Sequence, residues 1–301
     1  MSSVVSKNAD HLREYIMRLR GNADSPPDAS IVVPVNAQGD LLTVLKPLGD
    51  IAKYHGRHRI EIILVINNYP PEQPPIEIDE FRALGVEVVA AASARRPGEV
   101  VIVSARALGV RAAQSSVTLH FDADCQIPAV TALVDWYIAA LGSDAQLAYS
   151  LVGFYDYQNT PSVRIGIMIH HTVRWVKRTI LKVPTTRGSN YALDRDLFLQ
   201  LYDAGKLSVD LQVGPAAKLS GAKIVYSSNP SLRVLTSGRK LKGGWRQLYR
   251  YLRYRLHYNL KATPTRKHDV TRTSWDGFNQ ETSRRELINV PKKGEVSGSD
   301  K

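Results

Sequence analysis

Two aspartates separated by one residue lie at the end of an apolar run in the middle of the chain. Val117 to Phe121 predicts a short buried strand, and Asp122-Ala123-Asp124 follow it directly. Open α/β sheets bind their ligands at the carboxyl ends of strands, and residues i and i+2 of an extended chain share a face. Two hard oxygen ligands on one face suit Mg²⁺ or Mn²⁺, and such an ion can hold a diphosphate. The alternative is a solvated strand end with acidic turn residues.

Strands and helices must alternate around this pair for it to line a ligand cleft. Apolar runs that predict strands alternate with segments of helical periodicity: strands at Ser30 to Pro34, Ile60 to Ile66 and Val86 to Ala90, and helices at Asp40 to Tyr54 and Val101 to Gln114. This order predicts an α/β fold with a mostly parallel, doubly wound (Rossmann-like) sheet flanked by helices.

Composition narrows the class of protein. The chain has 301 residues, of which 44% are hydrophobic, enough for a sizeable core. The single cysteine, Cys125, excludes a disulfide framework and a multi-cysteine zinc site. No apolar run approaches the roughly 20 residues that span a bilayer, and Met1 to Arg20 lacks a signal core, so we expect a cytoplasmic protein. The net charge of +12 points to anionic partners: nucleotide diphosphates, phosphorylated acceptors, nucleic acid or anionic lipid.

The order of five segments resembles a family 2 glycosyltransferase with the GT-A fold. Along the chain these are Ile31-Val32-Val33-Pro34-Val35-Asn36, Asn67-Asn68, Ala105-Arg106-Ala107-Leu108-Gly109, Asp122-Ala123-Asp124 and Gly188-Ser189-Asn190. Val209-Asp210, ahead of a helix, matches the place of a Glu-Asp pair in that family. No single motif is specific, but the collinear set is, and it covers about residues 29 to 240.

The resemblance implies a role for each matched residue. The donor, a nucleotide-diphosphate sugar, is expected to contact Pro34, Val35, Asn36, Asn67, Asn68, Arg106, Asp122, Ala123, Asp124 and Arg239. The acceptor, which the sequence does not identify, is expected at Gly188, Ser189 and Asn190. Asp124 is the first choice as ligand of Mg²⁺ or Mn²⁺, with Asp122 contacting the ribose or the metal. For Arg106 the match favours a donor-side or structural polar role, and the alternative is solvent exposure; for Arg239 the alternative is a basic surface turn.

Sugar transfer to a hydroxyl needs particular chemical groups. A divalent ion and cationic side chains stabilise the charge that develops on the departing nucleoside diphosphate. An inverting enzyme also needs a carboxylate base for the acceptor hydroxyl, and the resemblance points to Asp210. The alternative is that Asp210 is an ordinary helix N-cap.

Departures from the family pattern keep other functions open. Asn67, Ala107 and Val209 replace the usual Asp, Asn and Glu, which would suit a degenerate, non-catalytic relative that binds membranes or anions. The Gln-x-x-Arg-Trp motif of processive synthases is absent, which favours transfer of one sugar to a discrete acceptor. A nucleotidyltransferase is a third class, but no Gly-rich phosphate loop precedes a helix.

The chain divides into four parts on this interpretation. They are an N-terminal helix and linker (1–28), a GT-A glycosyltransferase domain (29–240), an amphipathic basic helix (241–265) and a disordered tail (266–301). In the basic helix Trp245, Leu248, Leu252 and Leu256 form an apolar stripe among arginines. That helix either packs on the domain or makes a peripheral contact with an anionic membrane at its inner face. Nucleic acid is not an expected partner, and His257 is a weak candidate for an extra metal ligand by family analogy.

Overall fold

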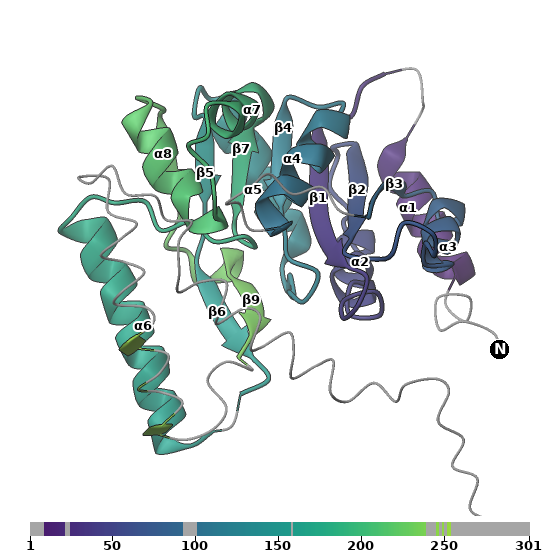
Figure 1. Cartoon of the computed structure of the whole chain (residues 1–301). Helices are drawn as coiled ribbons and strands as arrows, with labels where there is room; N and C mark the ends of the chain where they lie inside the picture. The colour runs from purple at the N-terminus through teal and green to yellow at the C-terminus, as the bar shows by residue number, and fades with distance from the viewer. Residues whose placement is uncertain are drawn as a thin grey trace, which may run out of the picture.

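The expected alternation of strands and helices is present, and it forms one mixed sheet. The computed structural model describes residues 9–21, 25–92, 101–157, 159–238, 245, 246, 249, 252 and 253. Seven strands pair in the order β3-β2-β1-β4-β7-β5-β8 (Figure 1). Their bounds are β1 Ala29–Asn36, β2 Ile60–Asn67, β3 Glu87–Ala91, β4 Val117–His120, β5 Leu147–Tyr149, β7 Tyr191–Asp194 and β8 Ile224–Tyr226.

Strand direction decides which ends of the strands meet. The pairs β1–β2, β2–β3, β1–β4 and β5–β8 are parallel, whereas β7 runs antiparallel to both β4 and β5. The prediction of a mostly parallel sheet is confirmed. Because β7 is reversed, its first residue, Tyr191, pairs with His120 at the last position of β4. The segment that enters β7 therefore reaches the same edge of the sheet as the residues that leave β4.

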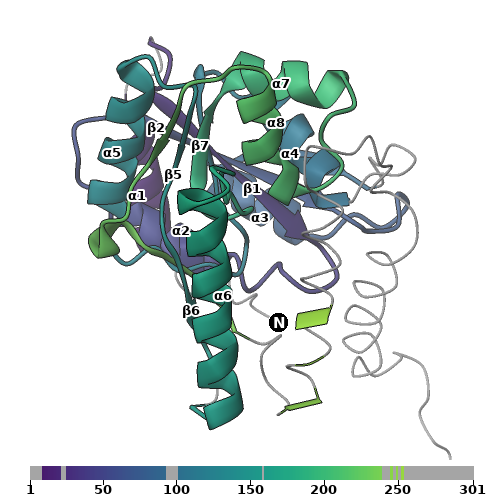
Figure 2. The same cartoon turned by 90° about the vertical axis from the view of Figure 1, so that its left-hand side faces the viewer.

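Helices cover both faces of the sheet, so β2 is buried throughout and β1 is buried up to its last residue, Asn36, which is partly exposed. On one face Ile31, Val33 and Leu64 pack with α1 (Ala9–Arg20), α2 (Leu45–Ala52), α3 (Glu77–Ala83) and α5 (Val130–Gly142). On the other face Val32 and Ile63 pack with α4 (Val101–Ala112), α7 (Arg195–Asp203) and α8 (Val213–Leu219). Figure 2 shows the two layers on either side of the sheet. Strands buried on both faces explain why the sequence reads as continuous apolar runs.

The expected N-terminal helix is part of this core. Ile16 and Leu19 of α1 are buried, at 2% and 4% exposure, in the same cluster as β1 and α2. Arg18 donates a hydrogen bond to the backbone oxygen of Tyr54 over 3.2 Å, which ties α1 to the segment after α2. Helix α2 is shorter than predicted, because residues 37–44 form turns and Pro47 falls in its first turn, where a proline is tolerated.

A second, smaller sheet lies beside the main one. It pairs β6 (Val152–Tyr155) with β9 (Val234–Ser237) in parallel, and Gln126 joins it through a bridge to Leu235. Helix α6 (Pro161–Thr179) follows β6 and runs along the outside of the molecule (Figure 1). Short 3₁₀ turns, η2 (Asp210–Gln212) and η3 (Pro230–Leu232), precede α8 and β9. Among the described residues no helix is long and apolar enough to cross a membrane.

The C-terminal part is described at five positions only. Residues 245, 246, 249, 252 and 253 are helical, and Leu252 packs against Val163, as Phe154 and Ile167 also do. Trp245, expected on the apolar stripe, is 62% exposed. The remainder of the expected basic helix, His257 and the tail from residue 266 lie outside the described residues.

One glycine allows α4 to approach the sheet closely. A Cβ atom added at Gly109 would lie 2.5 Å from Cγ1 of Val32 and 2.9 Å from Cγ2 of Val65, and both side chains are fully buried. The same addition at Gly142 meets nothing within 4 Å. Alanine at Gly109 would therefore change both helix propensity and packing against the sheet, whereas alanine at Gly142 would change helix propensity alone.

We expect Gly109→Ala to lower the free energy of unfolding by about 1–3 kcal/mol, because overpacking outweighs the ~1 kcal/mol that alanine gains over glycine in a helix. The matched control, Gly142→Ala at the end of α5, should leave stability unchanged or slightly raised. Urea unfolding followed by circular dichroism measures both. Equal stability of the two variants would contradict the close approach of α4 to β1 and β2.

Candidate active site

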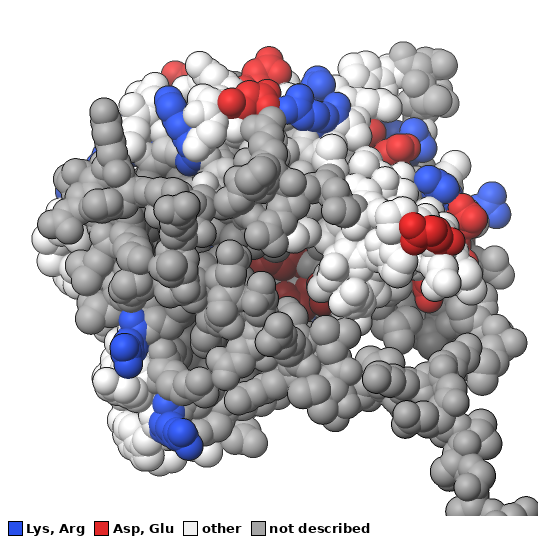
Figure 3. All heavy atoms as spheres, viewed as in Figure 1, with Lys and Arg blue, Asp and Glu red and all other residues white. Residues whose placement is uncertain are grey.

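The predicted site residues converge on the edge of the sheet where β1, β2 and β4 end. Asn36 and Asn67 are the last residues of β1 and β2, and Asp122 follows β4. The reversal of β7 brings Gly188, Ser189 and Asn190 to this edge. Asp210 arrives from the turn η2. In the space-filling view, acidic side chains lie in a hollow near the centre of the face (Figure 3).

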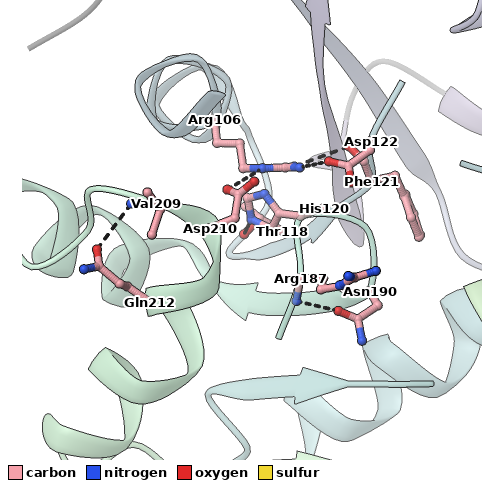
Figure 4. Close-up of polar contacts among 10 residues, drawn as sticks. All are labelled: Arg106, Thr118, His120, Phe121, Asp122, Arg187, Asn190, Val209, Asp210 and Gln212. Atoms are coloured by element: carbon pink, nitrogen blue, oxygen red, sulfur yellow. Dashed lines mark hydrogen bonds and ion pairs between the residues drawn. The ribbon is translucent and has the colours of Figure 1, made fainter. Parts of the chain in front are cut away.

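A buried arginine joins the carboxylates of the site (Figure 4). The side chain of Arg106, in the middle of α4, has no exposed surface. Its Nε donates to Oδ1 of Asp210 over 3.0 Å, and its Nη2 donates to Oδ1 of Asp122 over 2.5 Å. Its Nη1 donates to the backbone oxygen of Phe121 over 3.3 Å. The guanidinium thus ties α4 to the end of β4 and to η2, and its burial rules out the solvent exposure that was the alternative for Arg106.

Burial and charge set the protonation of this cluster. Desolvation by itself would lower the pKa of Arg106, but Asp210 and Asp122 more than offset it and raise that pKa. Desolvation raises the pKa of Asp210 above its ordinary value, Arg106 opposes this, and Asp122 adds to it. The side chain of Asp210 keeps 14% of its surface exposed and that of Asp122 keeps 24%. The arginine is charged, and Asp210 is a stronger base than an ordinary aspartate.

Asp210 does not act as the N-cap that the sequence left open. The residue in the N-cap position of η2 is Val209, which has extended backbone. The backbone N–H groups of Ser208 and Val209 are instead satisfied by Oε1 of Gln212, at 2.7 and 3.2 Å. The carboxylate of Asp210 is thereby left to pair with Arg106. Gln212 is a positioning residue that sequence reasoning missed.

Gly188 sits against all three charged groups. A Cβ atom at this position would lie 2.5 Å from Oδ1 of Asp122, 2.6 Å from Nη2 of Arg106 and 2.7 Å from Oδ2 of Asp210. A side chain would therefore separate the guanidinium from its carboxylates. This close approach gives a physical reason for a glycine in the segment that was matched to the acceptor site.

A buried aromatic layer supports the cluster from beneath. His120, the last residue of β4, is fully buried and stacks on the rings of Tyr191 and Phe198 at 4.5 and 5.2 Å. The hydroxyl of Thr118 donates to the backbone oxygen of Leu193 and lies 3.2 Å from Nε2 of His120. Burial, together with Arg106, lowers the pKa of His120, so the imidazole is neutral. The sequence does not indicate this aromatic layer, because His120 looks there like an isolated polar residue within the apolar run 117–121.

The carboxylate proposed for the metal lies next to the cluster and outside the arginine's contacts. Asp124 is partly exposed, and its backbone oxygen accepts a hydrogen bond of 2.7 Å from the hydroxyl of Tyr155 in β6. Lys46 lies over the ring of Tyr155 at 4.4 Å. No group of three metal-binding side chains occurs among the described residues. The donor set therefore fits an ion that takes one hard carboxylate oxygen from Asp124 and its other ligands from diphosphate and water.

The donor-side residues of β1 and β2 lie beside this carboxylate pair along the sheet edge. Pro34 and Val35 are buried within β1, and Ala123 is buried between the two aspartates. Asn68 has a positive φ of 63° and donates from Nδ2 to Oδ1 of Asn36 over 2.9 Å, which links the ends of β1 and β2. Asn67 is 5% exposed and bonds to the backbone oxygen of Val65. Arg239 lies outside the described residues.

Hydrogen bonds of a buried side chain hold the predicted acceptor segment in place. Asn190 is fully buried, accepts a hydrogen bond of 2.7 Å from the backbone N–H of Arg187 and donates to the backbone oxygen of Ser150. Ser189 is 1% exposed, and its hydroxyl has no hydrogen-bond partner among the described residues. Asn190 thus shapes the turn that carries Gly188.

We expect Arg106→Met to lower the free energy of unfolding by about 3 kcal/mol or more, because it leaves Asp122 and Asp210 buried without a counter-charge. Arg111→Met on the same helix is the matched control. Its partner is Asp203 at 2.6 Å, but both side chains are about half exposed, so its loss should amount to about 1 kcal/mol or less. Urea unfolding of both variants measures the difference, and similar losses would show that the buried pair carries no special stability.

Comparisons with known proteins support the architecture. No family model and no curated protein matches the sequence. Among solved structures, the chain is similar to the mannosyltransferase PcManGT from Pyrobaculum calidifontis in complex with GDP-Man and Mn²⁺, with a TM-score of 0.51 and 15% identity over 84% of this chain and 70% of that one.

A second similar structure is GalNAc-T7 with UDP, GalNAc and Mn²⁺, with a TM-score of 0.50 and 17% identity over 89% of this chain and 59% of that one. The chain is thus shorter than both proteins. At these identities the likeness concerns the fold, and membership of family 2 stays a prediction. The mostly parallel sheet, its reversed strand β7 and its flanking helices show that the chain has the GT-A fold of glycosyltransferases.

Proposed function

We propose that this protein is a glycosyltransferase that moves one sugar from a nucleotide-diphosphate sugar to an acceptor hydroxyl with the help of Mg²⁺ or Mn²⁺. The observation that carries the proposal is the convergence of Asp122, Asp124 and Asp210 on one edge of a GT-A sheet. Two similar structures were solved with a sugar nucleotide or nucleotide and Mn²⁺, which supports the same class of donor for this chain. The donor's sugar and base stay open.

The two aspartates after β4 have different roles in this proposal. Arg106 occupies one oxygen of Asp122, which leaves Asp122 fewer lone pairs for an ion and suits a contact with the ribose. Asp124 would hold the ion against the donor diphosphate. A bound ion there would stabilise the negative charge that develops on the leaving diphosphate. Arg106 has no exposed surface, so it acts on the donor through the carboxylates that it positions.

Asp210 is the proposed base of an inverting transfer. Its Oδ1 accepts from Arg106, while its Oδ2 faces Gly188 in the segment matched to the acceptor. An acceptor hydroxyl that approached Oδ2 would pass its proton there as its oxygen attacks the sugar. The raised pKa of Asp210 favours this role, since a base is more effective as its pKa nears the working pH.

A non-catalytic relative is the second candidate. It is favoured by Asn67, which is uncharged and bonded to its own strand, and by Val209, which is buried and leaves Asp210 without an acidic neighbour in the sequence. The buried ion pairs alone would also suit a purely structural cluster. Donor binding and turnover separate the two functions.

We expect wild-type protein to be stabilised by UDP or GDP in the presence of Mn²⁺, and Asp124→Ala to lose the Mn²⁺-dependent part of that stabilisation. The reason is that Asp124 supplies the protein's ligand to the ion. Thermal melting with each nucleotide, with and without Mn²⁺, measures the shift. Asp79→Ala, an exposed aspartate of α3, is the control and should melt like wild type. An unchanged Mn²⁺-dependent shift in Asp124→Ala would place the metal elsewhere.

We expect Asp210→Asn to lower turnover by ~10²-fold or more while leaving nucleotide binding nearly intact, the usual scale for a lost general base. Turnover is measured as nucleoside diphosphate released from the donor that binds in the thermal assay. Because a base must be deprotonated and the pKa of Asp210 is raised, the wild-type rate should fall on acidification at a pH above the ordinary aspartate value of about 4. Near-normal transfer by Asp210→Asn would remove Asp210 from the base role.

A further inference from the structure

Helix α6 carries an exposed face that the transfer chemistry does not use. Arg164, Met168, His171 and Trp175 follow one another at spacings of four, three and four residues, so they share one face of the helix. All four are exposed, with Met168 at 61% and Trp175 at 52%. The chain then continues through Ile180 and Leu181, which are 61% and 57% exposed. Large apolar side chains are thus gathered on one face and at one end of α6.

The segment that carries these apolar side chains is basic in sequence. From residue 161 to residue 193 the sequence contains no Asp or Glu, and its basic residues are Arg164, Arg174, Lys177, Arg178, Lys182 and Arg187. The end of α8 adds Lys218, which donates to the backbone oxygen of Lys182, and next to it Leu219, which is 68% exposed. We call Met168, Trp175, Ile180, Leu181, Lys182 and Lys218 the α6 patch.

We propose that the α6 patch docks on an anionic phospholipid bilayer. Tryptophan, isoleucine and leucine side chains insert at the boundary between headgroups and acyl chains, and nearby lysines are attracted to anionic headgroups. The charge of the patch complements such a surface, because no acidic residue of residues 161–193 or 213–233 opposes the lysines. The contact goes beyond sugar transfer and requires no reaction at the active site.

Other occupants of the patch fit less well. The described part of the C-terminal helix contacts α6 through Leu252, but at Val163, which is buried and lies on a different face from Met168 and Trp175. A second copy of the chain in a two-fold dimer would bring the same basic patch against itself, which like charges disfavour. An anionic bilayer can accept both kinds of side chain, the apolar ones at the acyl chains and the basic ones at the headgroups.

Docking through α6 would also place the bilayer near the active-site edge. Arg174 donates to the backbone oxygen of Thr185 over 2.6 Å, and Arg178 donates to its hydroxyl over 3.3 Å. Thr185 lies three residues before Gly188, which contacts the carboxylate cluster. The bilayer-bound helix is therefore fixed to the segment that we assign to the acceptor.

Vesicle sedimentation of the full chain tests the proposal. The protein is mixed at low salt with vesicles of phosphatidylcholine alone, or of phosphatidylcholine and phosphatidylglycerol at about two to one. We expect pelleting with the mixed vesicles only, and its loss as salt is raised. Absence of pelleting with mixed vesicles, or equal pelleting with both kinds, would overturn the proposal.

Paired variants locate the contact. Lys182→Glu should weaken partitioning by about tenfold or more, whereas Lys206→Glu, an exposed lysine after α7 with the same change in net charge, should have little effect. Ile180→Ser should weaken partitioning by about tenfold, whereas Ile76→Ser, 70% exposed before α3, should not. Equal losses within either pair would show non-specific adsorption and overturn the assignment.

Two further comparisons separate the other occupants. Trp175→Ser should lose vesicle binding and Trp245→Ser should keep it; the reverse result would assign the bilayer contact to the C-terminal helix. Light scattering without lipid should give the same molar mass for wild type and Trp175→Ser. A dimer that Trp175→Ser dissociates would make the patch a protein interface. Nucleotide-dependent melting of the variants should match wild type, so a failure of lipid binding is distinct from a failure of the glycosyltransferase proposal.

Discussion

The ion pairs of one buried guanidinium hold the site together. Arg106 has no exposed surface, and a charge in that position is tolerated only because Asp122, Asp210 and the backbone oxygen of Phe121 receive its hydrogen bonds. These partners come from the end of β4 and from η2, while the arginine comes from α4. The fold must bring all three elements to one point, and Gly188 must lack a side chain for them to meet. Removing Arg106 leaves both carboxylates without their counter-charge, and removing either carboxylate leaves the buried arginine with only one.

The three aspartates differ in their contacts with this arginine. Its guanidinium binds Asp122 and Asp210, whereas Asp124 lies outside its contacts. Asp210 is buried enough to be a stronger base than usual, and Arg106 opposes its protonation. One arginine thus links the carboxyl end of the parallel strand β4 to the turn η2, beside the segment that enters the reversed strand β7.

The sequence predicts those parts of the molecule whose signals are local. Apolar runs predict β1, β2 and β4 because these strands are buried, and Asp122 and Asp124 are recognisable because strand ends carry ligands. The reversal of β7 depends on pairing between residues about 70 positions apart, as in His120 with Tyr191, so no local pattern reveals it.

The partners of Asp210 are non-local for the same reason. Its ion pair with Arg106 spans 104 positions, and the capping of η2 by Gln212 freed its carboxylate for that pair. The sequence shows an aspartate ahead of a helix, which by itself favours an N-cap, and only the family resemblance points to a base. His120 was missed because its value lies in stacking on Tyr191 and Phe198, which come from distant elements.

The most direct test of the account is anomalous diffraction from crystals grown with Mn²⁺ and UDP or GDP. The account predicts an anomalous peak about 2.0–2.3 Å from a carboxylate oxygen of Asp124, with the diphosphate on its other side and Arg106 still bound to Asp122 and Asp210. A nucleotide bound away from the ends of β1, β2 and β4, or an ion with no contact to Asp124, would contradict it.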